Sequence, residues 1–510
     1  MLMLKVLIKL FQKFAGVGRA HGLNLLTLGA TVKNLTMLTD LYELTMMQGY
    51  FESGTFGKDC VFDMYFRKNP CDNGYSIFAG LEQFLDYIEG LRFWSEDLDY
   101  LRGLGLFTEP FLEYLRNFRF TGDIHAMHEG TLMFPYEPIV RVKAPIMEAQ
   151  LIESALLNII NHQSLVATKA ARVVEAARGD KVLEFGLRRA LGPDSAVYGA
   201  RAAIIGGCAA TSNVLCAQMF DVPVKGTHAH SWIMSFPDEL TAFRTYAKAF
   251  PGDLMLLVDT YDTLKSGVPN AITVFKELLD SGAAPRSLGI RLDSGDLAFL
   301  SKTARQMLDD AGLGMVTICA SNDLDEDLIT SLKLQGAAVT LWGVGTNLIT
   351  SKGCSSLGGV YKLVAEQSGD GWLPRIKLSN NPEKITTPGL KKVYRLLDKE
   401  SGKIKADLVT LDHEVLDMAN DLTIFDPKAT WRRMTLAGGR FEALELLIPV
   451  ITGGKRVYKS PPVLQISAYA AEQKRMLWDE HKRFIRPHIM PVDLSQELYD
   501  LKQRMIYENQ

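Results

Sequence analysis

Two histidines separated by a single residue lie in the segment KGTHAHSWIMSF, which covers residues 225–236. His228 and His230 are flanked by Gly226, Thr227 and Ser231. A glycine followed by alternating polar and apolar residues predicts a strand end that opens into a loop, where an imidazole nitrogen can be held facing a ligand. A lone histidine is more often a hydrogen-bonded structural residue, so a functional interpretation depends on the chemistry of the segments that follow.

Two of these segments are rich in charged groups. LLVDTYDTL carries Asp259 and Asp262, and GIRLDSGDL carries Arg291, Asp293 and Asp296. The planar guanidinium of an arginine can bind a phosphate or a carboxylate through two parallel hydrogen bonds. Aspartates can accept hydrogen bonds from sugar hydroxyls or hold magnesium through its water shell, although each one alone could equally be a helix cap.

Two later segments add small polar residues, CASNDLDE at residues 319–326 and WGVGTNLITS at residues 342–351. In the second, Gly343, Gly345 and Thr346 offer backbone amides and a hydroxyl that could bind a phosphate monoester. Glycine pairs are common at turns, and only the conjunction with the charged segments is specific. Taken together, the residue types predict a sugar phosphate as ligand, with a metal ion.

The elements that position these residues follow from the same segments. Each one joins an apolar run to a short polar run, which is typical of a buried parallel strand that ends in a ligand-binding loop. Several such strands in series predict an α/β fold with a βα barrel. The loops at the carboxyl ends of barrel strands share one face, so distant residues can meet around one substrate.

The chain resembles the nicotinate phosphoribosyltransferase family, which belongs to the type II phosphoribosyltransferases. The resemblance covers residues 36–510 in the expected order. It rests on these motifs: LTDLYELTMMQGYFESG at 38–54, FDMYFRKNP, FAGLEQFLDYIEGLRF, EFGLRRALGPD, GTHAHSW, LVDTYDT, RLDSGDL, SNDLDE, GVGTNLITS and RPHIMPVDLSQELYDLKQRMI.

The resemblance implies an irregular βα barrel with an N-terminal α/β sandwich domain and a C-terminal extension. It also implies an activity, the transfer of a phosphoribosyl group from phosphoribosyl pyrophosphate to nicotinate, coupled to ATP hydrolysis with Mg²⁺. His230 matches the histidine that is transiently phosphorylated, and Asp259 matches a carboxylate beside it that can orient the imidazole or help to hold magnesium. His228 occupies a variable position and receives no catalytic role.

The family also implies how the base is bound. Tyr42 matches a tyrosine contributed by the neighbouring subunit of a homodimer, and Phe185 matches the opposite face of the clamp around the pyridine ring. Arg188 is expected to meet the nicotinate carboxylate or the nucleotide phosphate, and Arg291 to contact substrate near the pyrophosphate and the base. Ser212 stands where relatives that use nicotinamide carry an aspartate, and the missing carboxylate favours nicotinate.

The remaining site residues surround the ribose and its phosphate. Asp293 is similar to the catalytic residue that holds the ribose hydroxyls. The other residues expected to bind substrate are Ser321 and Asn322, Gly343, Gly345 and Thr346 for the 5-phosphate, and Thr227 and Ser231 beside the histidines. The magnesium ligands cannot be assigned.

Composition narrows the classes of partner. The chain has 56 basic and 59 acidic residues and no basic stripe interleaved with aromatics, which argues against nucleic acid. No apolar run is long enough to span a membrane. The six cysteines show no metal-binding spacing, so we predict reduced thiols in a cytoplasmic protein.

We predict four regions. Residues 1–35 form an N-terminal extension without catalytic function, with lysines at positions 5, 9 and 13, and residues 36–140 an α/β domain with the dimer contact. Residues 141–360 form the barrel, and residues 361–510 pack on the N-terminal domain. The basic KKVYR at 391–395 is expected to be a solvated strand edge.

Two alternatives stay open. One is a related enzyme that uses nicotinamide; an enzyme for quinolinate fits less well, because it would not need the ATP-linked histidine. The other is a non-catalytic sugar-phosphate sensor on the same scaffold, which would be expected to have lost the histidine or an aspartate.

Overall fold

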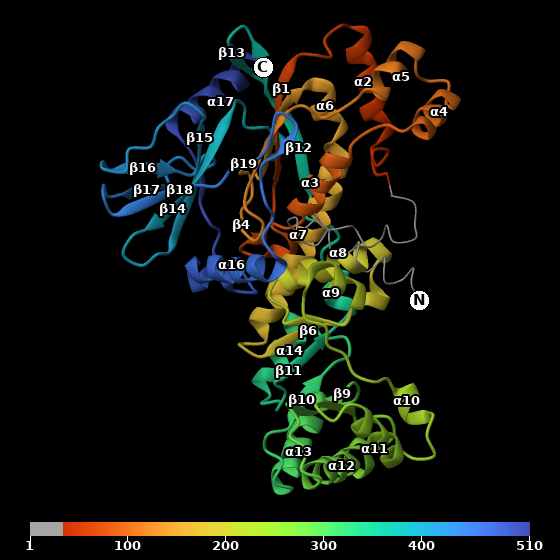
Figure 1. Cartoon of the computed structure of the whole chain (residues 1–510). Coiled ribbons are helices and arrows are strands. Elements are labelled where there is room, and N and C mark those ends of the chain that lie inside the picture. The colour runs from red at the N-terminus through yellow and green to blue at the C-terminus, as the bar shows by residue number, and fades with distance from the viewer. Residues whose placement is uncertain (1–33, 510) are drawn as a thin grey trace, which may run out of the picture.

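The computed structural model of this protein describes residues 34–509 (Figure 1). The N-terminal extension predicted for residues 1–35 falls almost entirely outside the described residues. The molecule is elongated, with a parallel sheet and its helices at one end and mostly antiparallel sheets at the other (Figure 1). No helix within the described range is both long enough and apolar enough to cross a lipid bilayer.

The parallel sheet has six strands in the order β7-β6-β11-β10-β9-β8. It curls without closing, since β7 and β8 are edge strands in the described part of the chain, and it confirms the predicted α/β fold with an irregular βα barrel. Its strands are β6 (Lys181–Glu184), β7 (Ala210–Thr211), β8 (Asp253–Leu257), β9 (Ser287–Leu292), β10 (Thr317–Ala320) and β11 (Leu341–Val344).

Helices that follow these strands cover the sheet. They are α8 (Pro193–Ile205), α9 (Val214–Phe220), α10 (His230–Met234), α11 (Glu239–Ala249), α12 (Val268–Asp280), α13 (Leu297–Asp310), α14 (Glu326–Leu334) and α15 (Thr346–Ile349), with short turns η3 (Leu187–Arg189) and η4 (Thr263–Gly267). The long helix α7 (Glu153–Ala176) precedes β6 and packs on α8 and α14.

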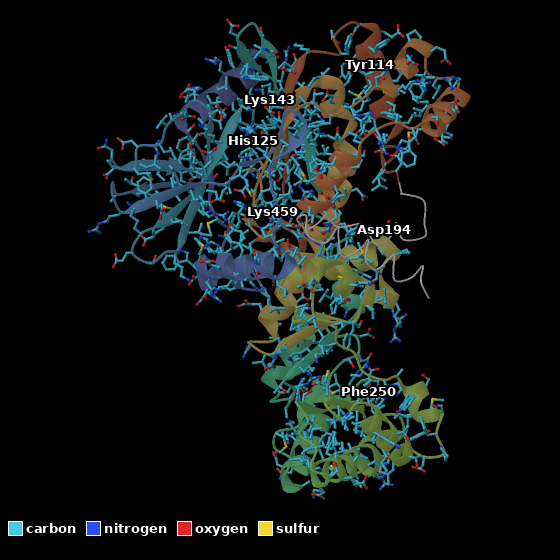
Figure 2. The ribbon with its side chains drawn as sticks, viewed as in Figure 1. Tyr114, His125, Lys143, Asp194, Phe250 and Lys459 are labelled. Carbon is cyan, nitrogen blue, oxygen red and sulfur yellow. A yellow bond between two sulfur atoms is a disulfide. The ribbon has the colours of Figure 1, made fainter. Side chains whose placement is uncertain are left out.

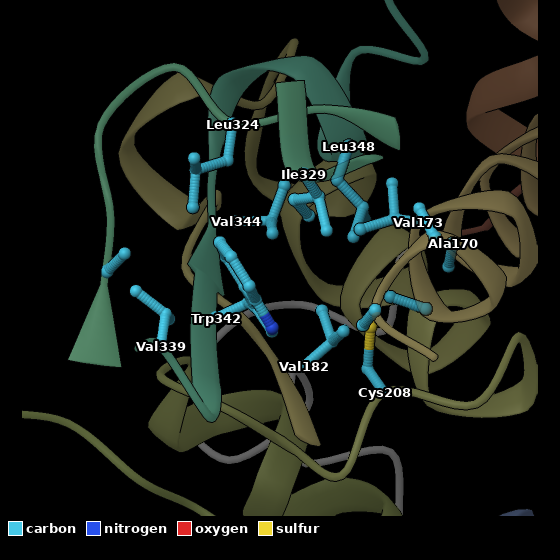
Figure 3. Close-up of a cluster of buried hydrophobic side chains, with 14 of the residues drawn as sticks. Ala170, Val173, Val182, Cys208, Leu324, Ile329, Val339, Trp342, Val344 and Leu348 are labelled. Carbon is cyan, nitrogen blue, oxygen red and sulfur yellow. The ribbon is translucent and has the colours of Figure 1, made fainter. Parts of the chain in front are cut away.

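A buried apolar core fixes the strand ends that carry the loops. Trp342 of β11 is fully buried and lies among Val182, Val339 and Val344, with Leu348 of α15 in the same cluster (Figure 3). Its indole Nε1 donates to the Asp180 carboxylate over 2.9 Å, so the polar atom of the ring is satisfied despite burial.

The second large sheet has seven strands in the order β13-β12-β1-β5-β3-β19-β20. Its strands are β1 (Asp59–Phe66), β3 (Asp123–Ala126), β5 (Val140–Pro145), β12 (Gly359–Ser368), β13 (Gly371–Pro374), β19 (Ile448–Thr452) and β20 (Lys455–Arg456), and β2 (Ser76–Ile77) pairs separately with β4 (Leu132–Met133). The early and late parts of the chain therefore share one sheet.

The early part of the chain is otherwise helical. Its elements are α2 (Leu41–Glu52), η2 (Pro70–Asp72), α3 (Leu81–Gly90), α4 (Ser95–Gly103), α5 (Glu109–Arg116) and α6 (Ile146–Leu151). The apolar faces of α3 and α5 join the core beneath β1 and β5.

The late part adds a four-stranded sheet with one parallel pair, a two-stranded antiparallel sheet and two helices. Its elements are β14 (Lys391–Asp398), β15 (Ile404–Leu411), β16 (Leu422–Phe425), β17 (Arg433–Leu436), β18 (Phe441–Glu445), β21 (Val492–Leu494), α16 (Val463–Met476), α17 (Gln496–Glu508), η5 (Pro382–Lys384) and η6 (Asp479–Lys482). The domain boundaries at residues 140 and 360 stay a prediction.

The expectation of a solvated strand edge at residues 391–395 is wrong. Strand β14 lies between β18 and β15 in its sheet. Lys391 is buried and its Nζ lies 2.9 Å from a carboxylate oxygen of Asp63, while Arg395 is buried and forms two hydrogen bonds to Asp407. The charges are buried because each one has an acidic partner, which a local count of basic residues could not reveal.

The expectation that all six cysteines are reduced is also wrong for one pair. Cys71 in η2 and Cys354 in the loop after α15 form a disulfide, with their Cα atoms 5.6 Å apart. They are 283 residues apart in sequence, so only the folded chain brings them together. Cys60, Cys208, Cys216 and Cys319 are free and buried.

Candidate active site

The carboxyl ends of the parallel strands meet at one edge of the sheet because their registers match. Glu184 pairs with both Val344 and Thr211, and Leu292 pairs with Ala320. The residues that follow these ends therefore emerge side by side, as the barrel prediction requires. Among them are Phe185, Ser212, Asp293, Ser321 and Gly345.

Arg291 is the centre of a hydrogen-bond network at this edge. Its Nε donates to Ser321 Oγ over 2.7 Å, its Nη1 to Thr227 Oγ1 over 2.8 Å and its Nη2 to Asp293 Oδ1 over 2.9 Å. Ser321 Oγ also donates to Asp293 Oδ1. Burial raises the pKa of Asp293, but the Arg291 charge and these hydrogen bonds outweigh it and hold that pKa below its usual range. Asp293 is therefore an anion at neutral pH.

His230 lies beside this network. It begins helix α10 rather than ending a strand, because the preceding residues 225–229 form an extended loop. Its Nδ1 lies 3.0 Å from Thr260 Oγ1, and its Nε2 lies 3.7 Å from Asp293 Oδ2. The imidazole side chain is 40% exposed, so a substrate can reach it while both nitrogens have neighbours.

Asp259 lies between the histidine loop and the Asp293 loop. Its Oδ2 accepts from the backbone N–H of Asp293 over 2.8 Å and from Ser294 Oγ over 2.6 Å. Its Oδ1 is buried and has no hydrogen-bond partner among the described residues. Asp259 thus anchors one loop to the next, and the neighbour of the imidazole is Thr260. Sequence reasoning missed Thr260, whose only signal was its place between two aspartates.

His228 has a structural environment. Its side chain is buried, its Nε2 accepts from the backbone N–H of Leu257 over 3.2 Å, and Tyr246 packs edge-on against its ring. Tyr246 in turn packs on Phe250, which is labelled in the lower lobe in Figure 2. Burial lowers the pKa of His228 to about 4, so the imidazole is neutral and serves as a hydrogen-bond acceptor.

Two of the aspartates considered for sugar or magnesium binding are helix caps. Asp262 Oδ1 accepts from the backbone N–H groups of Leu264 and Lys265 at the start of η4. Asp296 Oδ1 accepts from Phe299 N at the start of α13. Their carboxylates satisfy N–H groups that a helix leaves unpaired, which is the helix-cap alternative that the sequence left open.

The ring of Phe185 forms a wall of the site. The Arg291 guanidinium carbon lies 5.7 Å from the ring centroid, and Phe185 N donates to Val344 O over 2.8 Å. A Cβ at Gly343 would lie 2.7 Å from Phe185 Cδ2 and 2.8 Å from Cε2, and one at Gly345 would lie 3.1 Å from Phe185 O. These glycines therefore make room for Phe185, a role that their phosphate-loop interpretation did not include.

Glu184 is a further residue that sequence reasoning missed. It is fully buried, and burial raises its pKa. Its carboxylate accepts from Gly186 N and, over 2.6 Å, from Thr211 Oγ1, while its carbonyl accepts from Ser212 N. Glu184 thus ties the Phe185 turn to the turn that carries Ser212.

The other predicted residues follow the same strand ends or the histidine loop, and most of them are exposed. Arg188 is exposed in η3, and Ser231 is exposed in α10. Asn322 is exposed and adopts a left-handed backbone with φ of 88°, which a tight turn favours. Thr346 begins α15.

Tyr42 does not join the site within one chain. It lies on α2, at the far end of the molecule from β6, β9 and β11 (Figure 1). The residue is 45% exposed, and it is therefore available to another molecule.

The chain is similar to known proteins of one family along most of its length. Three family descriptions match: the nicotinate phosphoribosyltransferase (NAPRTase) N-terminal domain at residues 37–161, the NAPRTase family at residues 181–363 and the NAPRTase C-terminal domain at residues 390–502. The chain is 46% identical over 475 residues to nicotinate phosphoribosyltransferase of Bacillus subtilis, covering 93% of this chain and 96% of the relative. It is 35% identical to the Caenorhabditis elegans enzyme, with 93% of each chain covered.

Solved structures give the same result. The crystal structure of human nicotinic acid phosphoribosyltransferase matches with a TM-score of 0.81 at 31% identity, covering 92% of this chain and 99% of that chain. Nicotinate-nucleotide pyrophosphorylase from Pyrococcus furiosus matches with a TM-score of 0.66 at 24% identity, covering 88% of this chain and 97% of that chain, which supports the fold alone.

Proposed function

The chain belongs to the nicotinate phosphoribosyltransferase family, and we propose that it makes nicotinate mononucleotide and pyrophosphate from nicotinate and phosphoribosyl pyrophosphate, in NAD salvage. One observation carries this proposal. Arg291 donates to Asp293, and His230 Nε2 lies 3.7 Å from the same carboxylate, at the edge where Phe185 offers an aromatic wall. That edge holds the groups needed for a sugar phosphate and a planar base.

We further propose that ATP drives the cycle through His230. Its Nε2 faces the anionic Asp293, which stabilises a proton on that nitrogen. The lone pair on Nδ1 then attacks the γ-phosphorus of ATP, so that an N–P bond forms while the P–O bond to ADP breaks. The phosphohistidine adds about two negative charges that strengthen binding of the sugar-phosphate complex. Water later cleaves the N–P bond and releases phosphate.

The glycosyl transfer needs a bound base and a stabilised leaving group. We propose that Phe185 holds the pyridine ring so that its nitrogen faces the sugar carbon, with Arg188 near its carboxylate. The C–N bond forms as the bond to pyrophosphate breaks, and Arg291 offsets charge on the leaving group. Asp293 holds the ribose hydroxyls, and the backbone at Gly345 and Thr346 binds the 5-phosphate.

Magnesium fits this site through its aspartates. No group of three or more histidine, cysteine, aspartate or glutamate residues that could hold a metal occurs in the described range, but Mg²⁺ commonly uses only one or two carboxylates together with substrate phosphates and water. Asp259 has a buried carboxylate oxygen with no hydrogen-bond partner among the described residues, and Asp293 lies beside it. When bound there, magnesium would neutralise phosphate charge.

We propose a homodimer with shared sites. The support is that Tyr42 is exposed on α2, which lies far from β6, the strand before Phe185, in the same chain (Figure 1). In a homodimer with twofold symmetry, each chain can give its Tyr42 to the partner's barrel, where two aromatic faces would clamp the base. We also propose a cytoplasmic location: four of the six cysteines are free thiols, and the single Cys71–Cys354 disulfide does not by itself require an oxidising compartment.

Replacing His230 tests this proposal. We expect purified His230→Ala protein to lose ATP-stimulated turnover and the acid-labile phosphate acquired from ATP, with its fold intact. His413 is a matched control, because it is exposed, contacts only Glu497 at 3.0 Å in the ion pairs of the described residues, and lies outside the barrel. ATP stimulation that is equal in His230→Ala and His413→Ala would refute the phosphohistidine cycle.

A further inference from the structure

The two nitrogens of His230 have different neighbours. Nε2 faces the carboxylate of Asp293 at 3.7 Å, whereas Nδ1 lies 3.0 Å from the hydroxyl of Thr260. A carboxylate can only accept a hydrogen bond, so it favours the tautomer with the proton on Nε2. A hydroxyl can donate or accept, and with the proton on Nε2 it must donate to the lone pair of Nδ1.

The turn that carries Thr260 is fixed on both sides. Before it, Asp259 is held through its side chain by Asp293 N and Ser294 Oγ. After it, Asp262 caps the next turn by accepting from two backbone N–H groups. Farther along, Gly267 packs so closely on the Val258 carbonyl that any larger residue would clash. The backbone that carries the Thr260 side chain is therefore held in place.

We propose that Thr260 is a positioning residue for phosphorylation of His230. Its hydroxyl donates to the Nδ1 lone pair in the resting enzyme, and so fixes the imidazole plane and keeps the ring proton on Nε2. When ATP reacts, the Thr260 side chain turns about its Cα–Cβ bond, releases Nδ1 and donates instead to an oxygen of the transferred phosphoryl group. The hydroxyl proton stays on Thr260 throughout, so the N–P bond forms and the P–O bond to ADP breaks without any further proton transfer.

This inference rests on the proposed function, and it predicts a change in the rate of phosphoenzyme formation. Thr260 acts through His230 and contacts the phosphoryl group only as that group leaves ATP, so its loss slows phosphoenzyme formation without weakening ATP binding. Misorientation of a reacting group by about 1 Å can cost on the order of a hundredfold in rate. We expect a loss of about ten- to a hundredfold in the rate of phosphoenzyme formation.

The test uses rapid-quench measurements with radiolabelled ATP on the full-length protein. Thr260→Val and Thr260→Ala remove the hydroxyl with and without conserving side-chain size, and Thr260→Ser restores it. Thr273→Val is the matched control, because Thr273 is exposed on α12 and its hydroxyl donates to Pro269 O of its own helix. We expect both hydroxyl-free variants to be slow with a KM for ATP within about twofold of wild type, and the serine variant and the control to be fast.

Two results would overturn the inference. One is phosphoenzyme formation at the wild-type rate in Thr260→Val or Thr260→Ala. The other is a serine variant that is as slow as the valine variant, which would assign the effect to packing. If the wild-type protein itself forms neither phosphoenzyme nor nicotinate mononucleotide, the proposed function fails, and that result differs from failure of the Thr260 inference alone.

Discussion

Gly343→Ala is expected to disturb the base site through the ring of Phe185. The added Cβ would lie 2.7 Å and 2.8 Å from two ring carbons, whereas carbon atoms normally pack about 3.5–4.0 Å apart. The ring must therefore move by about 1 Å, because the hydrogen bond from Phe185 N to Val344 O holds its backbone. Loss of one stacked aromatic face costs about 0.5–1.5 kcal/mol, which corresponds to about a 2- to 13-fold rise in KM for nicotinate.

Steady-state kinetics with nicotinate and phosphoribosyl pyrophosphate varied separately would measure this change. We expect the KM for nicotinate to rise and the KM for phosphoribosyl pyrophosphate to change by less than about twofold. An unchanged KM for nicotinate, together with a raised KM for phosphoribosyl pyrophosphate, would show that Gly343 acts on the phosphate and would refute the steric argument.

Three further predictions follow from the same site. Ser212→Asp places a carboxylate near that of nicotinate, and we expect the ratio of kcat/KM for nicotinate over nicotinamide to fall at least about tenfold; an unchanged ratio would contradict this. In the folded protein the pKa of His228 is lowered to about 4, whereas in the unfolded chain a histidine has its ordinary pKa of about 6.5. The unfolded chain therefore binds a proton first, and stability falls as the pH drops. Between pH 7.5 and pH 5 the wild type should lose about 2 kcal/mol more of its unfolding free energy than His228→Gln does, as measured by denaturant titration. Equal losses in the two proteins would rule this out. Mixing Tyr42→Ala with Phe185→Ala subunits should restore about one quarter of wild-type activity through mixed dimers, whereas a mixture no more active than its parts would argue against shared sites.

The sequence predicted those parts of the site that depend on strand ends. Asp293 and Ser321 directly follow buried strands, and the matched register of parallel strands brings such residues together. The α/β class and the irregular barrel were predictable for the same reason, because apolar runs with polar ends are local patterns.

Features that depend on pairing across the chain could not be predicted in this way. Asp262 and Asp296 have the same residue type as the site aspartates, but the carboxylate of each one caps the helical turn that begins beside it. Lys391 belongs to a basic run, and only the fold supplies its buried partner Asp63. Cys71 and Cys354 come from distant segments. The spacing of residues along the sequence does not reveal such contacts.

The contact of Thr260 with His230 belongs to the same class. Motif comparison directed attention to Asp259, the charged neighbour, whereas the backbone turn directs the Thr260 hydroxyl to the imidazole and the Asp259 carboxylate to the next loop. Which of two adjacent side chains faces a histidine depends on backbone geometry that residue types do not specify.

Product formation by the purified full-length protein tests the central claim most directly. Nicotinate and nicotinamide would each be supplied with phosphoribosyl pyrophosphate and magnesium, with and without ATP, and the mononucleotides and ADP would be quantified by chromatography and mass spectrometry. We predict nicotinate mononucleotide from nicotinate, in amounts raised by ATP and accompanied by ADP. Product from nicotinamide alone, or no product from either base, would contradict the account.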